Sequence, residues 1–490
     1  MTETEHHQAV IVGGGFAGLA AAIELQKAGI NDFIILERAA EPGGTWRDND
    51  YPGCACDVPS VLYAYSFAPN PDWTRRYASQ AEIQRYFRSC VTRFQLASHF
   101  RCGAMMIGAR YDAATASWQV RTLDGRAFSA TVLIAATGGL SNPALPDIPG
   151  LDRFAGPSFH SARWDHGVSL AGRRVAIIGT GASAIQIVPQ LARMAAQVDL
   201  YQRRAAWVLP RNDRAVPKWL RAVYRRLPVL QRLARGSVYL QFEARALGMT
   251  RWPALMRLAA AMAKRHLRRQ VADPSLRARL TPDYGIGCKR ILIADDYYPA
   301  LASDRVALHA GGVCEITERG VVGIDGIERE ADVLVLATGF RVQAPPRRGV
   351  LIGRDGLDLA DAWRPAARAY LGTVVAGFPN FFMMTGPNTG LGHSSMLLMI
   401  EAQARYVAKA LRTMQANKLI SIEVRAEVLA AYDAELQARL GRTIWRADCG
   451  SWYVNANGRN TTLWPGFTFE FRRRLRRFRI SDYHLAPAAL

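Results

Sequence analysis

Three glycines near the start of the chain have the spacing of a phosphate-binding turn. They are Gly13, Gly15 and Gly18, and they lie between an apolar run at residues 9–12 and a helical pattern at residues 19–28. The first glycine permits a tight turn, the second lets the backbone approach a pyrophosphate, and the third lets helix and strand pack closely. The phosphates then lie on the amides at the positive end of the helix. The pattern predicts a dinucleotide site.

An acidic residue completes this first unit. Glu37 directly follows the apolar run at residues 33–36 and stands 19 residues after Gly18. A carboxylate at this place can accept hydrogen bonds from the diol of a ribose. Because the strand, the turn, the helix and the acid all stand in the required order, the glycines mark a true dinucleotide fingerprint.

A second turn of the same kind begins at Gly179 and continues through Gly181, Ser183 and Ala184. Alanine replaces the third glycine, which is a permitted variant. After the next apolar run the chain has Arg203 and Arg204 where the first unit has its acid. Arginine suits a 2′-phosphate, so the second turn is expected to bind NADP. The alternative is that these arginines are only surface charge.

The elements around the two turns predict an α/β fold with two Rossmann-like dinucleotide-binding domains. Two further apolar runs end in Ala-Thr-Gly, at residues 132–138 and 333–339, and each closes a Rossmann-like sheet. The expected domains are a first part of the FAD-binding domain at 1–149, an NADP-binding domain at 150–338, and a second part of the FAD-binding domain at 339–490. A helical insertion is expected at about 211–282 of the NADP domain.

The net charge of +21 over 490 residues comes largely from residues 211–279 and 471–479. In the first block, apolar residues alternate with arginines at helical spacing, and we expect amphipathic helices that pack their apolar face and leave the basic face in solvent. These apolar residues are Trp219, Leu220, Val223, Leu227 and Leu230. Peripheral contact with an anionic membrane is the weaker alternative. No nucleic-acid-binding motif accompanies the charge, so nucleic acid is not an expected partner.

The chain also carries few signs of an extracellular or membrane location. No uncharged apolar run reaches the roughly 18 residues that a membrane span needs, and the N-terminal residues lack a secretory pattern. Seven scattered cysteines do not indicate a disulfide framework, so we expect a cytoplasmic protein. Cys54 and Cys56 are one residue apart. They do not match the Cys-x-x-Cys pair of a disulfide reductase, and no clustered ligands indicate a metal.

Neither turn supplies a nucleophile, and no Ser/His/Asp or Cys/His set is evident, so a cofactor is expected to carry the chemistry. Two nucleotide sites in one chain suit hydride delivery from NADPH to a bound FAD. Reduced flavin reacts with O2, and the protein would then keep a C4a-peroxyflavin dry and correctly protonated. A fixed cation near the flavin would stabilise the peroxide anion and the alkoxide that it forms with a carbonyl.

Three strings bear on the kind of oxygen chemistry. One joins Phe154, Gly156, His160, Trp164 and Asp165; the second runs from Gly43 to Asp57; the third is Cys288-Lys289-Arg290. Together with the turns they resemble the type I Baeyer–Villiger monooxygenases. That resemblance implies oxidation of ketones to esters or lactones. Flavin-containing N- or S-monooxygenases, which act on amines or sulfides, resemble the first string only up to His160, and they remain the alternative.

The resemblance also implies roles for individual residues. Arg290 is the expected catalytic cation and Asp57 the carboxylate that holds it over the flavin. Lys289 is assigned to the NADP 2′-phosphate beside Arg203, and Trp452 to a mobile loop that closes over NADP. His160 and Trp164 are expected to couple NADP binding to domain movement, although a structural role for His160 is equally compatible. The remaining residues assigned to FAD are Gly44, Thr45, Trp46 and Tyr63. Neither the particular ketone nor the oligomeric state follows from the sequence.

Overall fold

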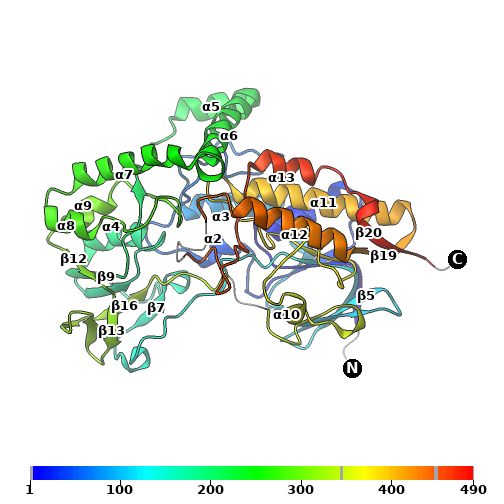
Figure 1. Ribbon diagram of the computed structural model, residues 1–490, viewed down its shortest axis with the longest axis horizontal. Coiled ribbons are helices and arrows are strands. Elements are labelled where there is room, and N and C mark those ends of the chain that lie inside the picture. Colours follow the sequence, from blue (N-terminus) through cyan, green and yellow to red (C-terminus); the bar gives the residue numbers. More distant parts are fainter. Residues whose placement is uncertain (1–3, 343–345, 446–450, 489–490) are drawn as a thin grey trace.

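Two large sheets organise the chain, one in each half of the view in Figure 1. The computed structural model describes residues 4–342, 346–445 and 451–488. The first sheet takes strands from both ends of the sequence, whereas the second takes its strands from the middle. The chain therefore leaves the first sheet once, completes the second, and returns.

The first sheet has the strand order β17-β4-β5-β6-β1-β2-β3, with β18 paired to β6. β1, β2, β6 and β18 run parallel, and β4, β5 and the first half of β6 form an antiparallel meander. Alternate residues of β1 face opposite sides, with Ala9 and Ile11 in one core and Val10 and Val12 in another. The strands are β1 (Glu5–Val12), β2 (Phe33–Leu36), β3 (Phe100–Arg101), β4 (Met106–Asp112), β5 (Ser117–Thr122), β6 (Ala127–Ala135), β17 (Leu351–Ile352) and β18 (Phe381–Met383).

The second sheet is wholly parallel, in the order β12-β9-β8-β16-β7. Its central strands are continuous apolar runs because helices or loops cover both faces. The strands are β7 (Ser158–His160), β8 (Arg174–Ile178), β9 (Gln197–Gln202), β12 (Val306–Ala310) and β16 (Val333–Leu336). Smaller antiparallel sheets join β13 (Val313–Ile316), β14 (Gly320–Gly323) and β15 (Glu328–Glu330), and β19 (Leu419–Val424) with β20 (Tyr483–Pro487); β10 (Val208–Leu209) pairs in parallel with β11 (Leu292–Ile293).

Each glycine turn leads from a strand into a helix, as the sequence predicts. β1 leads through Gly15 into α1 (Phe16–Lys27), and β8 leads through Ser183 into α4 (Ala184–Met194). α1 packs against α11 (Met396–Ala416), whose N-cap is Ser395. The other helices are α2 (Thr45–Asp48), α3 (Gln80–Arg93), α5 (Lys218–Arg226), α6 (Pro228–Thr250), α7 (Met256–Gln270), α8 (Pro274–Arg279), α9 (Tyr297–Leu301), α10 (Leu359–Ala362), α12 (Ala426–Leu440) and α13 (Thr468–Arg474).

Two linkers that connect the sheets pair with each other. The Ala144 N–H donates to the Gly339 carbonyl at 2.8 Å, and the Arg341 N–H donates to the Asn142 carbonyl at 3.0 Å. The Thr338 hydroxyl donates to the Ala144 carbonyl at 2.6 Å. Both crossings thus form one short double-stranded hinge, and they follow the two Ala-Thr-Gly strings. Our domain boundaries near residues 149 and 338 fall in or beside these linkers.

The basic insertion is helical, but it does not pack as expected. α5 and α6 project beyond the rest of the molecule at the top of Figure 1, and no residue of α5 is buried. Trp219, Leu227 and Leu230 are exposed, so the expectation of a packed apolar face is wrong for these three residues. Helical periodicity shows that residues share a face, but another element must be present to cover it. Within the described ranges, no helix is long and apolar enough to cross a membrane.

Candidate active site

The first glycine turn has the close approaches that the fingerprint requires. Gly13 has φ +113°, and a Cβ there would lie 2.4 Å from the Ala136 carbonyl oxygen. A Cβ on Gly18 would lie 2.0 Å from the Gly13 carbonyl oxygen, so helix α1 packs directly on the turn. Only glycine fits at either position without a backbone shift.

A second glycine segment faces this turn from the loop before α2. The Gly43 N–H donates to the Gly14 carbonyl at 2.9 Å. Gly44 has φ +56°, and a Cβ there would lie 2.9 Å from the Cα of Gly15. Gly15 and Gly44 therefore present bare backbone to each other at the N-terminus of α1. This is the kind of surface that a pyrophosphate can approach closely.

Glu37 lies at the end of β2 with its carboxylate directed at the same turn. It is buried, and one carboxylate oxygen accepts the Gly14 N–H at 2.8 Å. The other accepts the Ala39 N–H at 2.9 Å and lies 3.0 Å from the Arg47 guanidinium. A carboxylate offers about four acceptor positions, so capacity remains for a ribose hydroxyl. Sequence reasoning did not single out Arg47, whose guanidinium pairs with this buried carboxylate and offsets the cost of burying its charge.

The second turn repeats the backbone of the first. Gly179 has φ +111°, and a Cβ there would lie 2.4 Å from the Ala337 carbonyl oxygen. Space around Gly181 is open, Ser183 is half-buried, and the Ala184 methyl is buried at the start of α4. The turn thus has the backbone required for a second nucleotide, with a slightly larger residue where helix meets strand.

Arg203, Arg204 and Lys289 gather beside this second turn. Both arginines are exposed at the end of β9, and Lys289 arrives from a loop more than 80 residues away in sequence. Partial burial lowers the pKa of Lys289, and the positive charges of Arg204 and Arg203 lower it further. The Lys289 ammonium lies 4.7 Å from the centre of the Tyr284 ring. Cations that raise one another's energy in this way favour an anionic ligand such as a 2′-phosphate.

Arg290 and Asp57 meet although 233 residues separate them. The Arg290 Nε and Nη2 both donate to Oδ2 of Asp57, at 2.9 and 2.5 Å. The two side chains are 36% and 31% exposed, so the pair is partly open to a ligand. The Asp57 charge raises the pKa of Arg290 above its already high value. The guanidinium is therefore a fixed cation at any working pH.

Two tyrosines, Tyr63 and Tyr453, lie near the pair, each beside a tryptophan. The Trp46 Nε1–H donates to the Tyr63 hydroxyl at 2.7 Å, and the two rings meet edge to face. Burial raises the pKa of Tyr63, which also lies near the charges of Asp57 and Arg290. Tyr453, which the sequence did not single out, is buried near Arg290, and burial raises its pKa to about 12. Trp452 lies next to Tyr453 and is 45% exposed.

Gln186 is a further residue that sequence reasoning missed. It lies on α4 of the second unit, and its side-chain oxygen accepts the Tyr51 hydroxyl at 3.1 Å and the Ala55 N–H at 3.3 Å. Its Nε2 donates to the Ala55 carbonyl at 2.9 Å. A Cβ on Gly53 would lie 2.6 Å from the Gln186 carbonyl oxygen. The loop that carries Asp57 is thus clamped onto the helix that follows the second turn.

The string at residues 154–165 lies along the edge of the second sheet. Phe154 packs on the core of that sheet, and a Cβ on Gly156 would lie 2.6 Å from the Asp332 carbonyl oxygen. His160 ends strand β7 and packs edge to face on Phe340, in the second linker. Burial lowers its pKa, so it is neutral near pH 7. Trp164 packs on Phe159, and Asp165 is exposed and accepts the Gly167 N–H. The string therefore borders the hinge, and Arg163 and His166 at its end form ion pairs with Asp48 and Asp50.

Cys54 and Cys56 stand on the same loop as Asp57 but are poor candidates for thiol chemistry. Both are free and buried. Burial raises the pKa of Cys54 to about 12 and that of Cys56 higher still. Since the thiolate is the reactive form, neither residue supports disulfide exchange at neutral pH.

Comparison with known proteins extends this geometry to a family. The model of a family described as "Pyridine nucleotide-disulphide oxidoreductase" matches residues 10–259. The chain is 46% identical to a Baeyer–Villiger monooxygenase of Pseudomonas aeruginosa over 99% of its own length and 92% of that protein. It is 47% identical to a Baeyer–Villiger monooxygenase of Streptomyces coelicolor, over 99% of this chain and 94% of the relative.

A solved structure gives the same result for the fold. The crystal structure of OTEMO in complex with FAD and NADP matches with a TM-score of 0.87 and 27% sequence identity, over 99% of this chain and 100% of that one. The predicted α/β fold and the family predicted from the three strings are both confirmed. The chain belongs to the Baeyer–Villiger monooxygenases, FAD- and NADPH-dependent enzymes.

Proposed function

We propose that this enzyme inserts one atom of O2 between the carbonyl carbon of a ketone and its neighbouring carbon, with Arg290 as the catalytic cation. The products are an ester or lactone and NADP, while the second oxygen atom leaves as water with the hydride and a proton. The observation that carries this proposal is the two-pronged Arg290–Asp57 ion pair at the junction of the two nucleotide units.

The first unit is assigned to FAD and the second to NADPH. When it is bound and reduced by NADPH, FAD would be the group that reacts with O2 in this family's chemistry. The bare backbone of Gly13, Gly15, Gly18 and Gly44 suits the FAD pyrophosphate, and Glu37 suits its ribose. We assign Thr45, Trp46 and Tyr63 to the same cofactor, since Thr45 and Trp46 directly follow Gly44 and Tyr63 is hydrogen-bonded to Trp46. Arg203 and Lys289 suit the NADP 2′-phosphate, above the turn formed by Gly179, Gly181, Ser183 and Ala184.

Arg290 can stabilise negative charge because Asp57 fixes its position. A guanidinium has five N–H groups, and the Nε and one Nη2 hydrogen are directed at Asp57. The remaining N–H groups can donate to an oxyanion that develops during oxygen transfer, where a preorganised cation has its largest effect. Asp57 is a positioning residue in this scheme. Its loop is held by Gln186, which links the pair to the second nucleotide turn.

The string at residues 154–165 and Trp452 receive roles that do not involve the oxygen. His160 packs against the linker residue Phe340, so we assign it and Trp164 to movement at the hinge. Trp452 lies beside Tyr453, close to Arg290, and its exposure suits a residue that closes over NADP.

The test is the variant Arg290→Ala in FAD-loaded enzyme, assayed for both ester product and NADPH consumption. We expect ester formation to fall by more than about 100-fold, since a preorganised charge-stabilising donor contributes about 10²–10³ in kcat. NADPH oxidation should continue, because hydride transfer does not need this cation. Arg126→Ala is the matched control, since its Nε and Nη2 likewise meet a single oxygen of an aspartate, Asp124, in the turn between β5 and β6.

Retained ester formation in Arg290→Ala would exclude Arg290 as the catalytic cation. If the variant still binds FAD but loses both NADPH oxidation and ester formation, Arg290 would instead be assigned to NADPH binding. An assay with a sulfide substrate distinguishes ketone oxidation from sulfide oxidation. A soft nucleophile does not need the cation, so its oxidation should survive the substitution.

A further inference from the structure

Helices α5, α6 and α7, with the turn between α6 and α7, form an arm at residues 218–270 that directs apolar side chains outward. Trp219, Leu233, Leu240 and Leu258 are 65–67% exposed. Singly exposed apolar residues are common on proteins, but a group of large ones along neighbouring helices marks an interaction surface. In Figure 1, α5 and the adjoining part of α6 project from the body of the molecule, and α7 runs along the upper edge of the left half.

The exposed residues form stripes. On α7, Leu255, Leu258 and Met262 are exposed at helical spacing from the preceding turn onward, and on α6 Leu230, Leu233 and Leu240 are exposed at spacings of three and seven. Residues three, four and seven apart lie on the same helix face. Each of these helices therefore has apolar side chains on two sides. One side is buried against the protein, and the other is exposed.

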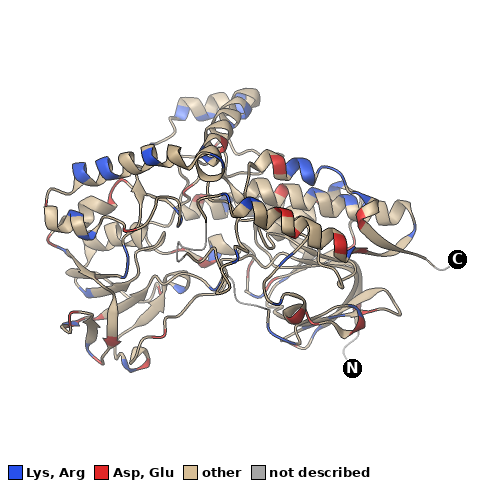
Figure 2. Cartoon of the chain, viewed as in Figure 1, with Lys and Arg blue, Asp and Glu red and all other residues tan. Residues whose placement is uncertain are grey.

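Basic residues accompany these stripes. Residues 218–270 contain 13 Lys and Arg and a single acid, Glu243, which is buried. In Figure 2, Lys and Arg recur along α5, α7 and α13, on the same upper edge of the molecule. An apolar stripe with basic flanks and no spanning helix is the pattern of a segment that lies in the interface of an anionic membrane.

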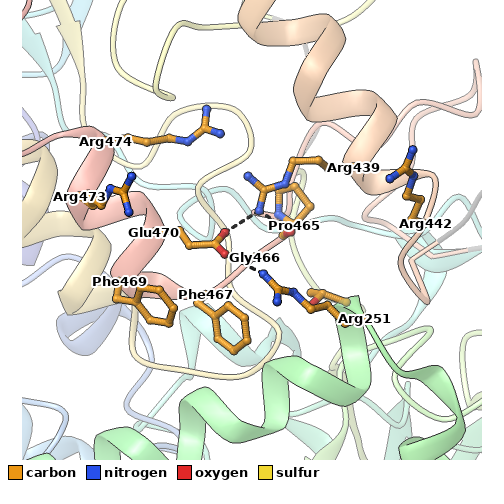
Figure 3. A pocket seen from close by; sticks show the side chains of 11 residues that line it. Arg251, Arg439, Arg442, Pro465, Gly466, Phe467, Phe469, Glu470, Arg473 and Arg474 are labelled. Atoms are coloured by element: carbon orange, nitrogen blue, oxygen red, sulfur yellow. Dashed lines mark hydrogen bonds and ion pairs between the residues drawn. The ribbon is translucent and has the colours of Figure 1, made fainter.

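A pocket at the base of the arm concentrates the charge. It has a volume of about 470 Å³ and lies between the end of α6, the end of α12 and α13 (Figure 3). Its lining includes five arginines: Arg251, Arg439, Arg442, Arg473 and Arg474. Arg251 directly follows α6, so the pocket is continuous with the arm.

Carboxylates neutralise only part of this charge. Glu470 lies 2.6 Å from Arg439 and 3.4 Å from Arg251, and Glu435 pairs with Arg474. Among the described residues, two carboxylates thus face five guanidinium groups, so the positive charges outnumber the negative ones there. Phe469 lines the pocket and is exposed, and Trp252 is exposed beside Arg251. Guanidinium groups with bidentate geometry suit a phosphate, and the aromatic side chains suit the adjoining interface of a bilayer.

We propose that the arm and the arginine pocket form a docking face for an anionic phospholipid bilayer. The apolar stripes enter the interface, and the pocket receives a headgroup phosphate. The charge favours this occupant over a second copy of the chain, because two such faces in contact would bring their cations together. This docking role is separate from ketone oxidation and does not depend on the role of Arg290.

The experiment is flotation of the FAD-loaded enzyme with vesicles of phosphatidylcholine alone or mixed with phosphatidylglycerol. We expect binding to the anionic vesicles only, weakened at high salt because salt screens the charges. Arg442→Glu with Arg473→Glu should weaken binding by at least about tenfold, as should Leu233→Ser with Leu240→Ser. Ester formation from a water-soluble ketone should be unchanged in both variants.

Matched controls lie away from the arm. Ile324→Ser with Ile327→Ser changes equally exposed apolar residues in the turn after β14, and Arg110→Glu with Arg121→Glu changes exposed arginines on β4 and β5. Neither should alter flotation. The proposal is overturned if anionic vesicles fail to bind the enzyme at low salt, or if the control variants lose binding as fully as the arm variants. It is also overturned if the arm mediates self-association without lipid, which sedimentation of the same variants would show.

Discussion

The turn at residues 13–18 and the turn at residues 179–184 hold their first glycine in nearly the same way. Gly13 and Gly179 have φ values of +113° and +111°, and a Cβ on either would lie 2.4 Å from the carbonyl oxygen of an alanine in an Ala-Thr-Gly string. The two turns differ at the third position. Glycine is required at 18, where a Cβ would lie 2.0 Å from a carbonyl oxygen, whereas position 184 accommodates a buried methyl.

The larger difference lies at the end of the following strand. In the first unit Glu37 is buried and accepts a hydrogen bond from the turn itself. In the second unit Arg203 and Arg204 are exposed, and Lys289 joins them from another loop. In our proposal the shared backbone receives a pyrophosphate, and the side chains beyond it discriminate between the two riboses. Specificity is therefore open to change in the second unit with little effect on the fold.

The largest expected effect comes from Gly18→Ala, which disrupts the first turn at the third position, where the two turns differ. The methyl group would meet backbone, which cannot rotate away, so α1 must move. We expect a loss of about 1–3 kcal/mol in the free energy of unfolding, and loss of bound flavin. The flavin-to-protein absorbance ratio and thermal unfolding measure both effects.

Ala184→Gly is the matched change in the second turn. It removes a methyl group that the backbone already accommodates, so it should cost at most about 1 kcal/mol in unfolding free energy and leave FAD in place. Equal effects of the two substitutions would show that the turns do not differ in the closeness of helix and strand.

Arg203→Ala tests whether the second turn distinguishes NADPH from NADH through the 2′-phosphate on the ribose. A hydrogen bond to a charged group contributes about 1.5–3 kcal/mol, so KM for NADPH should rise by roughly 10- to 100-fold. KM for NADH should change little, since NADH lacks the 2′-phosphate. Steady-state kinetics with both cofactors measure this. Arg193→Ala, on the exposed face of α4, is the control and should change neither. A parallel rise for both cofactors would contradict the assignment.

The smallest expected effect is a dependence on pH. Partial burial and the charges of Arg204 and Arg203 lower the pKa of Lys289 from 10.5, so its proton is lost earlier than from a free lysine. KM for NADPH should therefore begin to rise below pH 10.5, as the cation is lost. Below its folded pKa the protonated lysine costs stability, and this cost disappears as pH rises towards 10.5.

Arg203→Ala tests the cause of this shift. It removes one repelling cation, so the pKa of Lys289 should rise and the increase in KM should move to higher pH. The profile of KM against pH in the variant decides the matter. A profile that does not move would show that the charge of Arg203 does not lower the pKa of Lys289, which would leave burial and Arg204 as the causes.

Local chemistry was visible in the sequence because each turn is a continuous string. The positions of Gly13, Gly15, Gly18 and Glu37, and the arginine at 203, follow from spacing against an apolar strand and a helix. The family followed from strings whose fixed residues match one by one. What spacing could not give were contacts between distant segments, such as Gln186 with the Asp57 loop and Tyr453 near Arg290.

The sequence by itself determined that the chain has two dinucleotide turns followed by side chains of opposite charge, and a set of family residues, since these depend on short-range order. Only the tertiary structure decided that Asp57 and Arg290 meet across 233 residues, and that the two linkers pair as one hinge. It also decided that Trp219, Leu227 and Leu230 remain uncovered. Helical period places side chains on one face, but whether that face is buried depends on where the rest of the chain lies.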